Sequence, residues 1–294
     1  MPEYAAWPRK AFNAANYAVL ILLAVLCVLP LVHLLAMSLS TNAAVSAGKV
    51  TLWPIGFNWE SYRFILNKPE FLRSLGVSLQ RLALGVVINM LITILVAYPL
   101  SKEASAFKGR SVYVWIFVFT MLFSGGIIPV YMTIRSLGLI DSIWALVLIP
   151  AVNVFNIVIL LNFFRGLPKE LEEAAVVDGA GQWLILWRIY VPLSTPSLAT
   201  LTLFCLVNHW NSWFDGILFM NSPTHYPLQS YLYTIIVSVD TLVNSNTDVE
   251  TLSIISDRTA RAAQIFLGAL PILCVYPFLQ RYFTKGIVLG SVKE

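Results

Sequence analysis

Long apolar runs separated by short polar stretches dominate the pattern of this chain. A helix needs roughly 20 apolar residues to cross the ~30 Å hydrocarbon layer of a membrane. Six runs reach that length, at about residues 17–37, 75–100, 111–131, 143–164, 196–220 and 262–283. The pattern therefore predicts an all-α polytopic membrane protein of about six transmembrane helices, with residues 1–294 forming a single transmembrane domain.

The third run contains a helix-breaking sequence. Ser124, Gly125 and Gly126 interrupt it, and Pro129 follows. Glycine and proline at membrane depth are tolerated where neighbouring helices or a cavity satisfy the freed backbone groups. We therefore expect a break in the third span, facing protein or a pathway more than lipid.

Composition agrees with the membrane prediction. Hydrophobic residues make up 58% of the chain and charged residues only 12%, about half the share typical of a soluble domain. Six spans leave no length for a separate soluble enzyme domain. The net charge of +4 is small and scattered, which argues against nucleic-acid binding. The three cysteines fall in apolar runs without metal-ligand spacing, so they are interpreted as small core residues.

The Lys and Arg residues predict the orientation. With both termini in the cytoplasm, the inner loops hold more of these residues, as the positive-inside rule requires. Most of the outer charges fall in two long loops, about Ser38–Ser74 and Asn221–Arg261, and we count Arg81 with them. Long loops have little influence on topology. We therefore predict that the N- and C-termini are cytoplasmic.

The loop between the fourth and fifth spans, about residues 165–192, has an unusual composition. Pro168 suits the first turn of a helix, and three glutamates follow near the positive end of the helix dipole. Ala174 and Ala175 give a thin face for close packing, and Gly179 provides a stop. These features predict a short amphipathic helix outside the membrane, on its cytoplasmic side.

The same loop resembles the EAA signature of ABC importer permeases. That signature reads EAA, three residues, G, nine residues, I, one residue, then LP. The matching positions are Glu173, Ala174, Ala175, Gly179, Ile189 and Pro192, with Val191 in place of the usual Leu and Asp178 just before the glycine. The resemblance implies that this stretch is the coupling helix that docks in a groove on a separate ATPase subunit.

Further segments resemble the maltose-type (MalG-like) carbohydrate permeases and their LplC-like branch. They are residues 121–129, 137–139, 209–215, 226–229, 276–283 and 285–293. The resemblance implies a type I ABC importer permease fold in a bacterial inner (cytoplasmic) membrane. It also implies a sister permease, two ATPase subunits and an extracytoplasmic solute-binding protein as partners. The substrate implied is an oligosaccharide, which in this branch includes acidic ones such as alginate fragments.

No phosphate-binding loop of the form G-x-x-x-x-G-K-[ST] occurs in the chain. We therefore expect a transport subunit that is not itself an enzyme and binds no cofactor, with ATP and magnesium held by the partner ATPase. No catalytic residues and no metal site are predicted, and His209 has no Cys or second His at ligand spacing.

Polar side chains inside the predicted spans are candidates for the sugar pathway. Amide groups hydrogen-bond hydroxyls, and aromatic rings offer a stacking face for a sugar. The alternative is hydrogen bonding between helices and interfacial anchoring by tryptophan. Asn89, His209 and Asp215 are also polar, but the candidates that combine these properties are Asn153, Asn156, Asn208, Trp210, Asn211 and Trp213.

Two other classes compete with the permease. An ion-coupled secondary transporter predicts several acids within the spans, and only Asp215 comes close. A membrane enzyme such as a lipid-linked glycosyltransferase predicts a charged cluster at one membrane face. The acidic cluster of this chain lies in the predicted coupling helix.

Overall fold

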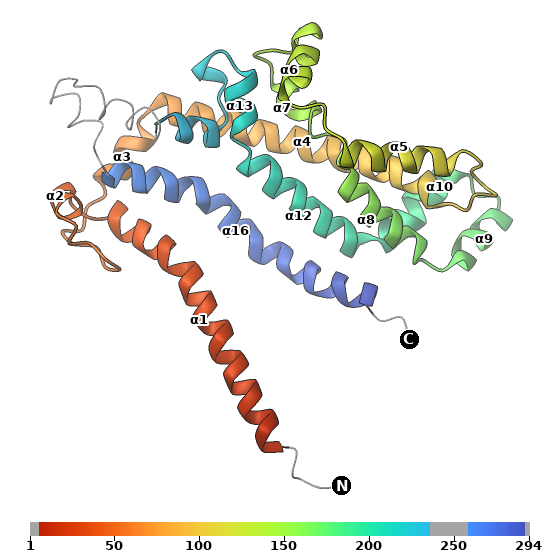
Figure 1. Ribbon diagram of the computed structural model, residues 1–294, viewed down its shortest axis with the longest axis horizontal. Coiled ribbons are helices and arrows are strands. Elements are labelled where there is room, and N and C mark those ends of the chain that lie inside the picture. The colour runs from red at the N-terminus through yellow and green to blue at the C-terminus, as the bar shows by residue number, and fades with distance from the viewer. Residues whose placement is uncertain (1–5, 236–257, 292–294) are drawn as a thin grey trace. The chain divides into compact units, whose positions relative to one another are not determined.

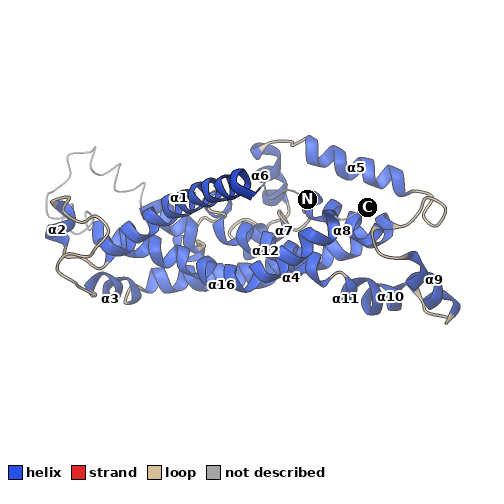
Figure 2. Ribbon diagram, turned by 90° about the horizontal axis from the view of Figure 1, so that it is seen from below, coloured by secondary structure: helices blue, strands red, loops and turns tan. Residues whose placement is uncertain are grey.

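The structure, a computed structural model, describes residues 6–235 and 258–291. Every regular element in these residues is a helix, as Figure 2 shows, so the predicted all-α class is confirmed. The longer helices are α1 (Ala6–Ser38), α4 (Pro69–Ser101), α5 (Arg110–Leu122), α6 (Ile127–Ser136), α8 (Val154–Arg165), α9 (Lys169–Val177), α12 (Thr195–Asn211) and α16 (Arg258–Ser291). Shorter ones are α2 (Asn42–Ser46), α3 (Glu60–Leu66), α7 (Ile143–Leu148), α10 (Gln182–Ile185), α11 (Val191–Leu193) and α13 (Phe214–Phe219).

The chain divides into two compact units. Residues 1–69 and 234–270 form the first, and residues 70–233 and 271–294 the second. Most of the predicted outer loop Asn221–Arg261 lies outside the described residues.

The first unit contains a long exposed helix, α1. Apolar side chains along α1 are open to the surroundings, for example Ile21 at 63% and Leu22 at 59% exposure. A helix that is apolar all round and uncovered is suited to lipid or to another membrane helix. Its last turn meets the loop that follows, where His33 Nδ1 lies 2.6 Å from the carbonyl oxygen of Thr51.

The second unit is built around α4, α8 and α12 (Figure 1). Its main apolar cluster joins the last turns of α4 to α8 and to the segment that leads into α12. Fully buried members include Ala97, Leu160, Ile185 and Leu201. Burying a side chain of the size of leucine stabilises by about 1.5–3 kcal/mol, so this cluster fixes how the three helices pack.

Among the described residues, three helices are long and apolar enough to cross a membrane, and the number rises to six if each of three bent pairs counts as one span. The third predicted span is such a pair: α5 and α6 meet at 114° across residues 123–126. The expected break at Ser124–Gly126 is therefore present, and Gly126 has a φ of 86° that favours glycine.

The fourth span is also bent, by 45° between residues 151 and 154. Asn89 of α4 donates its side-chain amide to the carbonyl oxygen of Pro150 at 2.8 Å. A buried carbonyl at a broken helix needs a donor, and Asn89 supplies one from a neighbouring helix. This sequence-predicted polar residue therefore supports the fold at the bend.

The predicted run 196–220 is two helices in the structure. The first, α12, ends at Asn211, and the second, α13, begins at Phe214. Residues Gln182–Leu193 precede α12 and meet it at 81°. The apolar run could not reveal this division, because the polar groups that hold the break at residues 212–213 come partly from α4.

Candidate functional site

The helix α9 begins and ends as its sequence predicts. Pro168 precedes its first turn, and Asp178 follows its last residue. Gly179 has a φ of 81°, and its backbone N–H donates to the carbonyl oxygen of Val176. The backbone N–H of Ala180 donates to the carbonyl oxygen of Ala175 at 2.8 Å. These two bonds form a Schellman motif, which satisfies the last carbonyls of the helix. The C-terminal end of the nine-residue helix is therefore fixed by hydrogen bonds from the residues that directly follow it.

A cluster of four side chains ties α9 to the rest of the second unit. Lys102, just after α4, lies 2.5 Å from one oxygen of Glu172 in α9. Tyr190, which precedes α11, donates its hydroxyl to the other oxygen at 2.6 Å. The Lys102 ammonium lies 4.1 Å from the ring centre of Tyr98 and 4.5 Å from that of Tyr190. We call Tyr98, Lys102, Glu172 and Tyr190 the inner cluster.

The ionisation of the inner cluster follows from burial and pairing. Burial opposes the charge on Glu172, but hydrogen bonds from Lys102 and Tyr190 outweigh it and lower the pKa of that carboxyl. Burial also lowers the pKa of the Lys102 ammonium, against the opposing effect of Glu172. Both pKa values are lowered, which favours the charged form of Glu172 but opposes the charged form of Lys102, the more deeply buried of the pair at 13% against 23% exposure. The pairing therefore stabilises the carboxylate most clearly.

The two alanines of the EAA sequence have different surroundings. Ala175 packs against the main apolar cluster of its own chain, whereas Ala174 is exposed. Glu173 and Val177 share the exposed side with Ala174, and Val177 is 86% exposed. One face of α9 therefore holds it to this chain, and the other is free to meet another protein.

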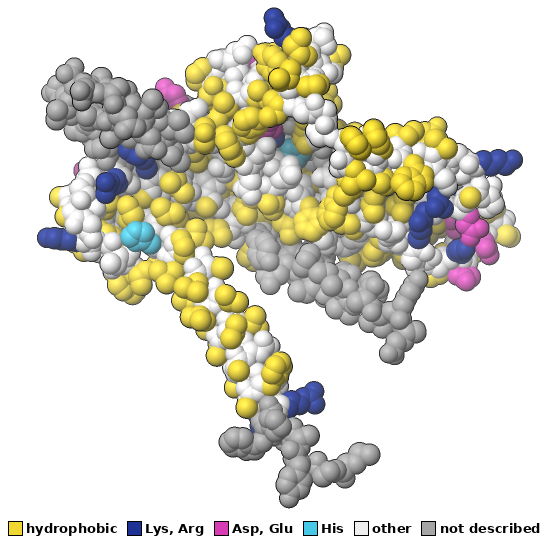
Figure 3. All heavy atoms as spheres, viewed as in Figure 1, with side chains coloured by type: hydrophobic (Ala, Val, Ile, Leu, Met, Phe, Trp, Pro, Cys, Tyr) yellow, Lys and Arg dark blue, Asp and Glu magenta, His cyan; other side chains and the backbone are white. Residues whose placement is uncertain are grey.

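The remaining coupling candidates lie near this helix. Ile189 packs on the main apolar cluster, and Asp178 and Pro192 are exposed. Segments α9 to α11 lie together at one end of the second unit in Figure 1. Figure 3 shows Lys and Arg side chains beside Asp and Glu side chains at the same end. The region of α9 to α11 therefore has an apolar side that packs on this chain and an exposed side that carries charged residues.

A second polar cluster forms where α12 ends. Arg81 of α4 forms an ion pair with Asp215 of α13, and Arg81 also donates to the backbone carbonyl of Ser212 at 3.3 Å. The Ser212 hydroxyl donates to Asp215 at 2.9 Å, as does the backbone N–H of Gly216. We call Arg81, Ser212 and Asp215 the outer cluster.

The outer cluster corrects one prediction from the sequence. Counting Arg81 with the charges of an outer loop is wrong, because its side chain is 1% exposed and lies inside the second unit. A buried guanidinium requires an ionic partner, and Asp215, which lies 134 positions further along the chain, is that partner. Asp215 is therefore a structural acid at a helix break in this structure.

His209 lies on the same side of α12 as this cluster. It is 3% exposed, and neither ring nitrogen has a hydrogen-bond partner. Its ring lies against Gly85 of α4, where an added Cβ would come within 2.4 Å of the imidazole. Gly85 therefore permits the close approach of α4 and α12. The described residues offer no group of three metal-ligating side chains.

The structure separates the six pathway candidates. Asn208, Asn211 and Trp213 are exposed, and Trp213 stacks on Tyr233 at a centroid distance of 4.1 Å. Asn153 caps α8, where its side chain accepts from the backbone N–H of Asn156 at 3.2 Å. Asn156 itself is 1% exposed and donates to the sulfur of Cys205 in α12. The exposed three can meet a solute, and the other two asparagines serve the packing of helices.

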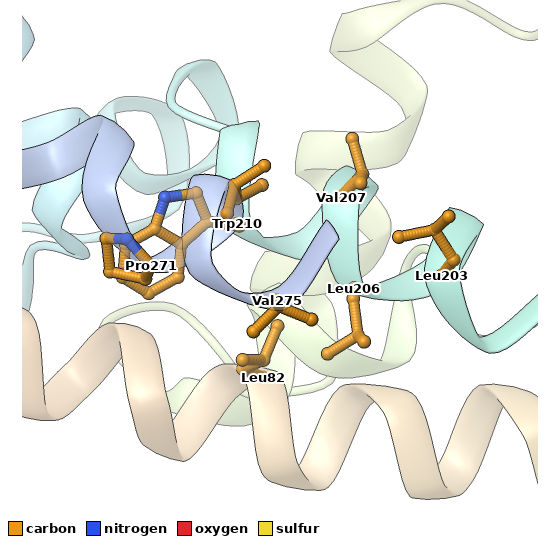
Figure 4. A pocket seen from close by; sticks show the side chains of 8 residues that line it. Leu82, Leu203, Leu206, Val207, Trp210, Pro271 and Val275 are labelled. Atoms are coloured by element: carbon orange, nitrogen blue, oxygen red, sulfur yellow. The ribbon is translucent and has the colours of Figure 1, made fainter. Parts of the chain in front are cut away.

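Trp210, the sixth candidate, is buried at 3% exposure. Its indole and the ring of Pro271 both line a cavity of about 40 Å³, together with other apolar side chains (Figure 4). Leu82, Leu203 and Val275 are among them. An apolar cavity of this size gives no partners for sugar hydroxyls, so Trp210 has a packing role here.

Several residues of these sites were not singled out from the sequence. They are Tyr98, Lys102, Glu172 and Tyr190 of the inner cluster, and Arg81 and Gly85 near the outer one. The charge of Arg81 within an apolar run was the one signal that could have marked it. The other residues have no sequence pattern that distinguishes them from ordinary residues of a span or a loop.

Comparisons with known proteins agree with this geometry. The family model of the binding-protein-dependent transport system inner membrane component matches residues 82–288. Protein LplC of Bacillus subtilis (strain 168) is 39% identical over 284 residues, covering 97% of this chain and 95% of its own. The polygalacturonan/rhamnogalacturonan transport system permease protein YtcP of the same organism is 38% identical over 285 residues, covering 97% and 99%.

A solved structure is similar over nearly the whole chain. It is a chain of a bacterial ABC transporter involved in the import of the acidic polysaccharide alginate. The TM-score is 0.85 at 33% identity, covering 96% of this chain and 100% of that one. The predicted importer permease fold is therefore confirmed.

Proposed function

Because this chain belongs to the family of binding-protein-dependent transport system inner membrane components, and is the permease of an ABC sugar importer, we propose that α9 is its coupling helix. In this proposal α9 docks on a separate ATPase subunit in the cytoplasm. The full transporter contains a sister permease, two ATPase subunits that hold ATP and magnesium, and an extracytoplasmic binding protein. Both termini of this chain are cytoplasmic, in a bacterial inner membrane.

The observation that carries this proposal is that one side of α9 is attached to the rest of this chain while the other side is exposed. Its inner side is joined by Glu172 to Lys102 at the end of α4 and to Tyr190 at the start of the next span. Its outer side exposes Glu173, Ala174 and Val177. In this proposal, a movement of the ATPase bound to the exposed side is transmitted through Glu172 to the two membrane spans next to Lys102 and Tyr190. A contact between subunits is needed, because the nucleotide and the spans are on different chains.

The proposed substrate is an acidic oligosaccharide. The supporting evidence is that YtcP and the alginate transporter are both named for acidic polysaccharides. Asn208, Asn211 and Trp213 expose amides and a ring that suit sugar hydroxyls and a sugar face. Uptake measured with matched neutral and uronic-acid oligosaccharides tests this. Preference for the neutral set contradicts the acidic assignment.

Paired threonine substitutions at two glycines test the coupling role. Gly179→Thr places a β-branched residue at a φ of 81°, which strains the end of α9 by about 1–2 kcal/mol. Gly181→Thr is the matched control, because Gly181 has a φ of −75° and open space around it, and threonine caps the following helix as well as glycine does.

The readouts are sugar uptake and ATPase stimulation by the loaded binding protein, in proteoliposomes of the assembled transporter. The Gly179→Thr variant should insert and assemble but lose most of its sugar uptake and ATPase stimulation, whereas the Gly181→Thr variant should retain both activities. Equal activity of the two variants would show that the conformation at the end of α9 does not matter for coupling.

A further inference from the structure

A large hollow lies beside α9 in the second unit. Its volume is about 780 Å³, and it is bounded by the end of α4, the start of α5, the end of α8 and α9. Four cationic and three acidic side chains line it, together with apolar groups such as Phe164 and Val177, and the acids are Glu103, Glu172 and Glu173. The cations are Lys102, Arg110, Arg165 and Lys169. A hollow of this kind has room for a group larger than a few waters.

The two lysines of the hollow are already neutralised. Lys102 pairs with Glu172, and Lys169 forms an exposed ion pair with Glu103. Arg110 and Arg165 differ, because neither has a carboxylate within 4 Å among the described residues. The charges of these two arginines also repel each other. The hollow therefore contains two arginines without an ion-pair partner in the described part of the chain, and its lining carries one net positive charge, from four cations and three carboxylates.

Both arginines are held in place by the backbone of α4. Arg110 donates to the carbonyl oxygen of Lys102 at 3.0 Å, and Arg165 donates to that of Leu100 at 3.2 Å. Each guanidinium keeps further N–H groups, and the Nε of Arg110 is buried with no partner. Guanidinium N–H groups suit the oxygens of a phosphate, which accept bidentate bonds. The pair is thus positioned for an oxyanion.

The position of Arg110 indicates where that oxyanion comes from. Arg110 is the first residue of α5, a 13-residue helix with no side-chain cap at its N-terminus. Tyr113 and Trp115, one turn later, are 51% and 71% exposed. Exposed tyrosine and tryptophan near the end of a span are typical of the interface between lipid and water. The aromatic residues that follow Arg110 therefore favour a place for it near the lipid headgroups.

We infer that Arg110 and Arg165 bind the phosphate of an anionic phospholipid from the inner leaflet, in the hollow beside α9. The inference rests on the proposed function for its cytoplasmic orientation. Basic pockets between spans on the cytoplasmic side are suited to such headgroups. The bound lipid neutralises the two arginines and fills the space between the spans and the coupling helix. It thereby favours the docked position of α9.

The test uses the assembled transporter in nanodiscs with either pure phosphatidylcholine or a mixture with phosphatidylglycerol. Native mass spectrometry counts retained phosphatidylglycerol, and ATPase stimulation by the loaded binding protein is measured in parallel. The variants are Arg110→Gln with Arg165→Gln, and Arg165→Gln alone in case the double variant does not assemble. Arg188→Gln is the matched control, because Arg188 is exposed and does not line the hollow.

We expect affinity for phosphatidylglycerol to fall roughly fivefold for each arginine removed and about 30-fold for both. The control should retain wild-type affinity. Equal retention by the wild type and the glutamine variants would overturn the inference, as would a loss of the same size in Arg188→Gln. Inorganic phosphate added to phosphatidylcholine nanodiscs should not reproduce the stimulation, and if it does, the ligand is a free anion and not a lipid.

The lipid count also separates this inference from the proposed function. A wild-type transporter that retains the lipid through these arginines but shows no stimulation by the binding protein contradicts the proposed function alone. If ATPase stimulation is normal but retention of the lipid does not depend on the two arginines, only the lipid site is contradicted.

Discussion

The outer cluster includes Arg81 within α4 and the inner cluster includes Lys102 just after its end, and these two ion-paired regions differ in how completely they are enclosed. Arg81 and Lys102 are 21 residues apart (102 − 81), which is about 31 Å along a helix at 1.5 Å per residue. This is close to the ~30 Å thickness of the hydrocarbon layer. The two clusters are therefore separated along the chain by about the thickness of a membrane.

The outer cluster is closed within one chain. A guanidinium with a fixed fork bonds both a carboxylate and the freed carbonyl at the break between α12 and α13. The inner cluster uses a lysine between two aromatic rings, and its carboxylate sits on a short helix whose other face is exposed. The difference teaches that the contact of α4 with α13 is rigid, whereas its contact with α9, whose other face is exposed, is adaptable.

The largest expected effect comes from breaking the outer ion pair. Asp215→Leu leaves the Arg81 guanidinium buried without its partner, and we expect a loss of about 3–5 kcal/mol in stability. The measurement is thermal unfolding of the purified transporter, with expression as a second readout.

The control for that experiment is the double variant Arg81→Leu with Asp215→Leu, which removes both charges. It should recover much of the lost stability, because no unpaired charge remains. If Asp215→Leu alone unfolds like the wild type, the outer cluster is not a rigid joint and the comparison fails.

An intermediate effect is expected at the close approach of α4 and α12. Gly85→Ala places a methyl group within 2.4 Å of the His209 ring, and overpacking of this kind typically costs about 1–3 kcal/mol. Gly76→Ala, in the same helix with open space around it, is the matched control. Thermal unfolding should show a loss for Gly85→Ala only. Similar unfolding of both variants would mean that α12 moves away at little cost.

The smallest effect on stability is expected in the inner cluster. Tyr190→Phe removes one hydrogen bond to Glu172, while Lys102 still pairs with that carboxylate. We expect a loss of about 1 kcal/mol in stability but a clear fall in ATPase stimulation by the loaded binding protein. The matched control is Tyr113→Phe, because Tyr113 is exposed and outside the cluster. Unchanged stimulation in Tyr190→Phe would remove the functional distinction between the two clusters.

The sequence by itself determined the features that depend on neighbouring residues. The apolar runs predicted the helical membrane fold, the glycines at 125–126 predicted the break between α5 and α6, and Gly179 predicted the end of α9. The spacing from Glu173 to Pro192 predicted the family. Each of these follows from local backbone preference or from a fixed spacing, which a sequence displays directly.

Only the tertiary structure decided which distant side chains meet. It paired Arg81 with Asp215, turned Ala175 inward and Ala174 outward, and buried Trp210 while leaving Trp213 exposed. It also brought Arg110 and Arg165 to one hollow. Helical periodicity shows which residues share a face but not what that face contacts. Burial and charge pairing depend on those contacts, so they were fixed only when the helices packed together.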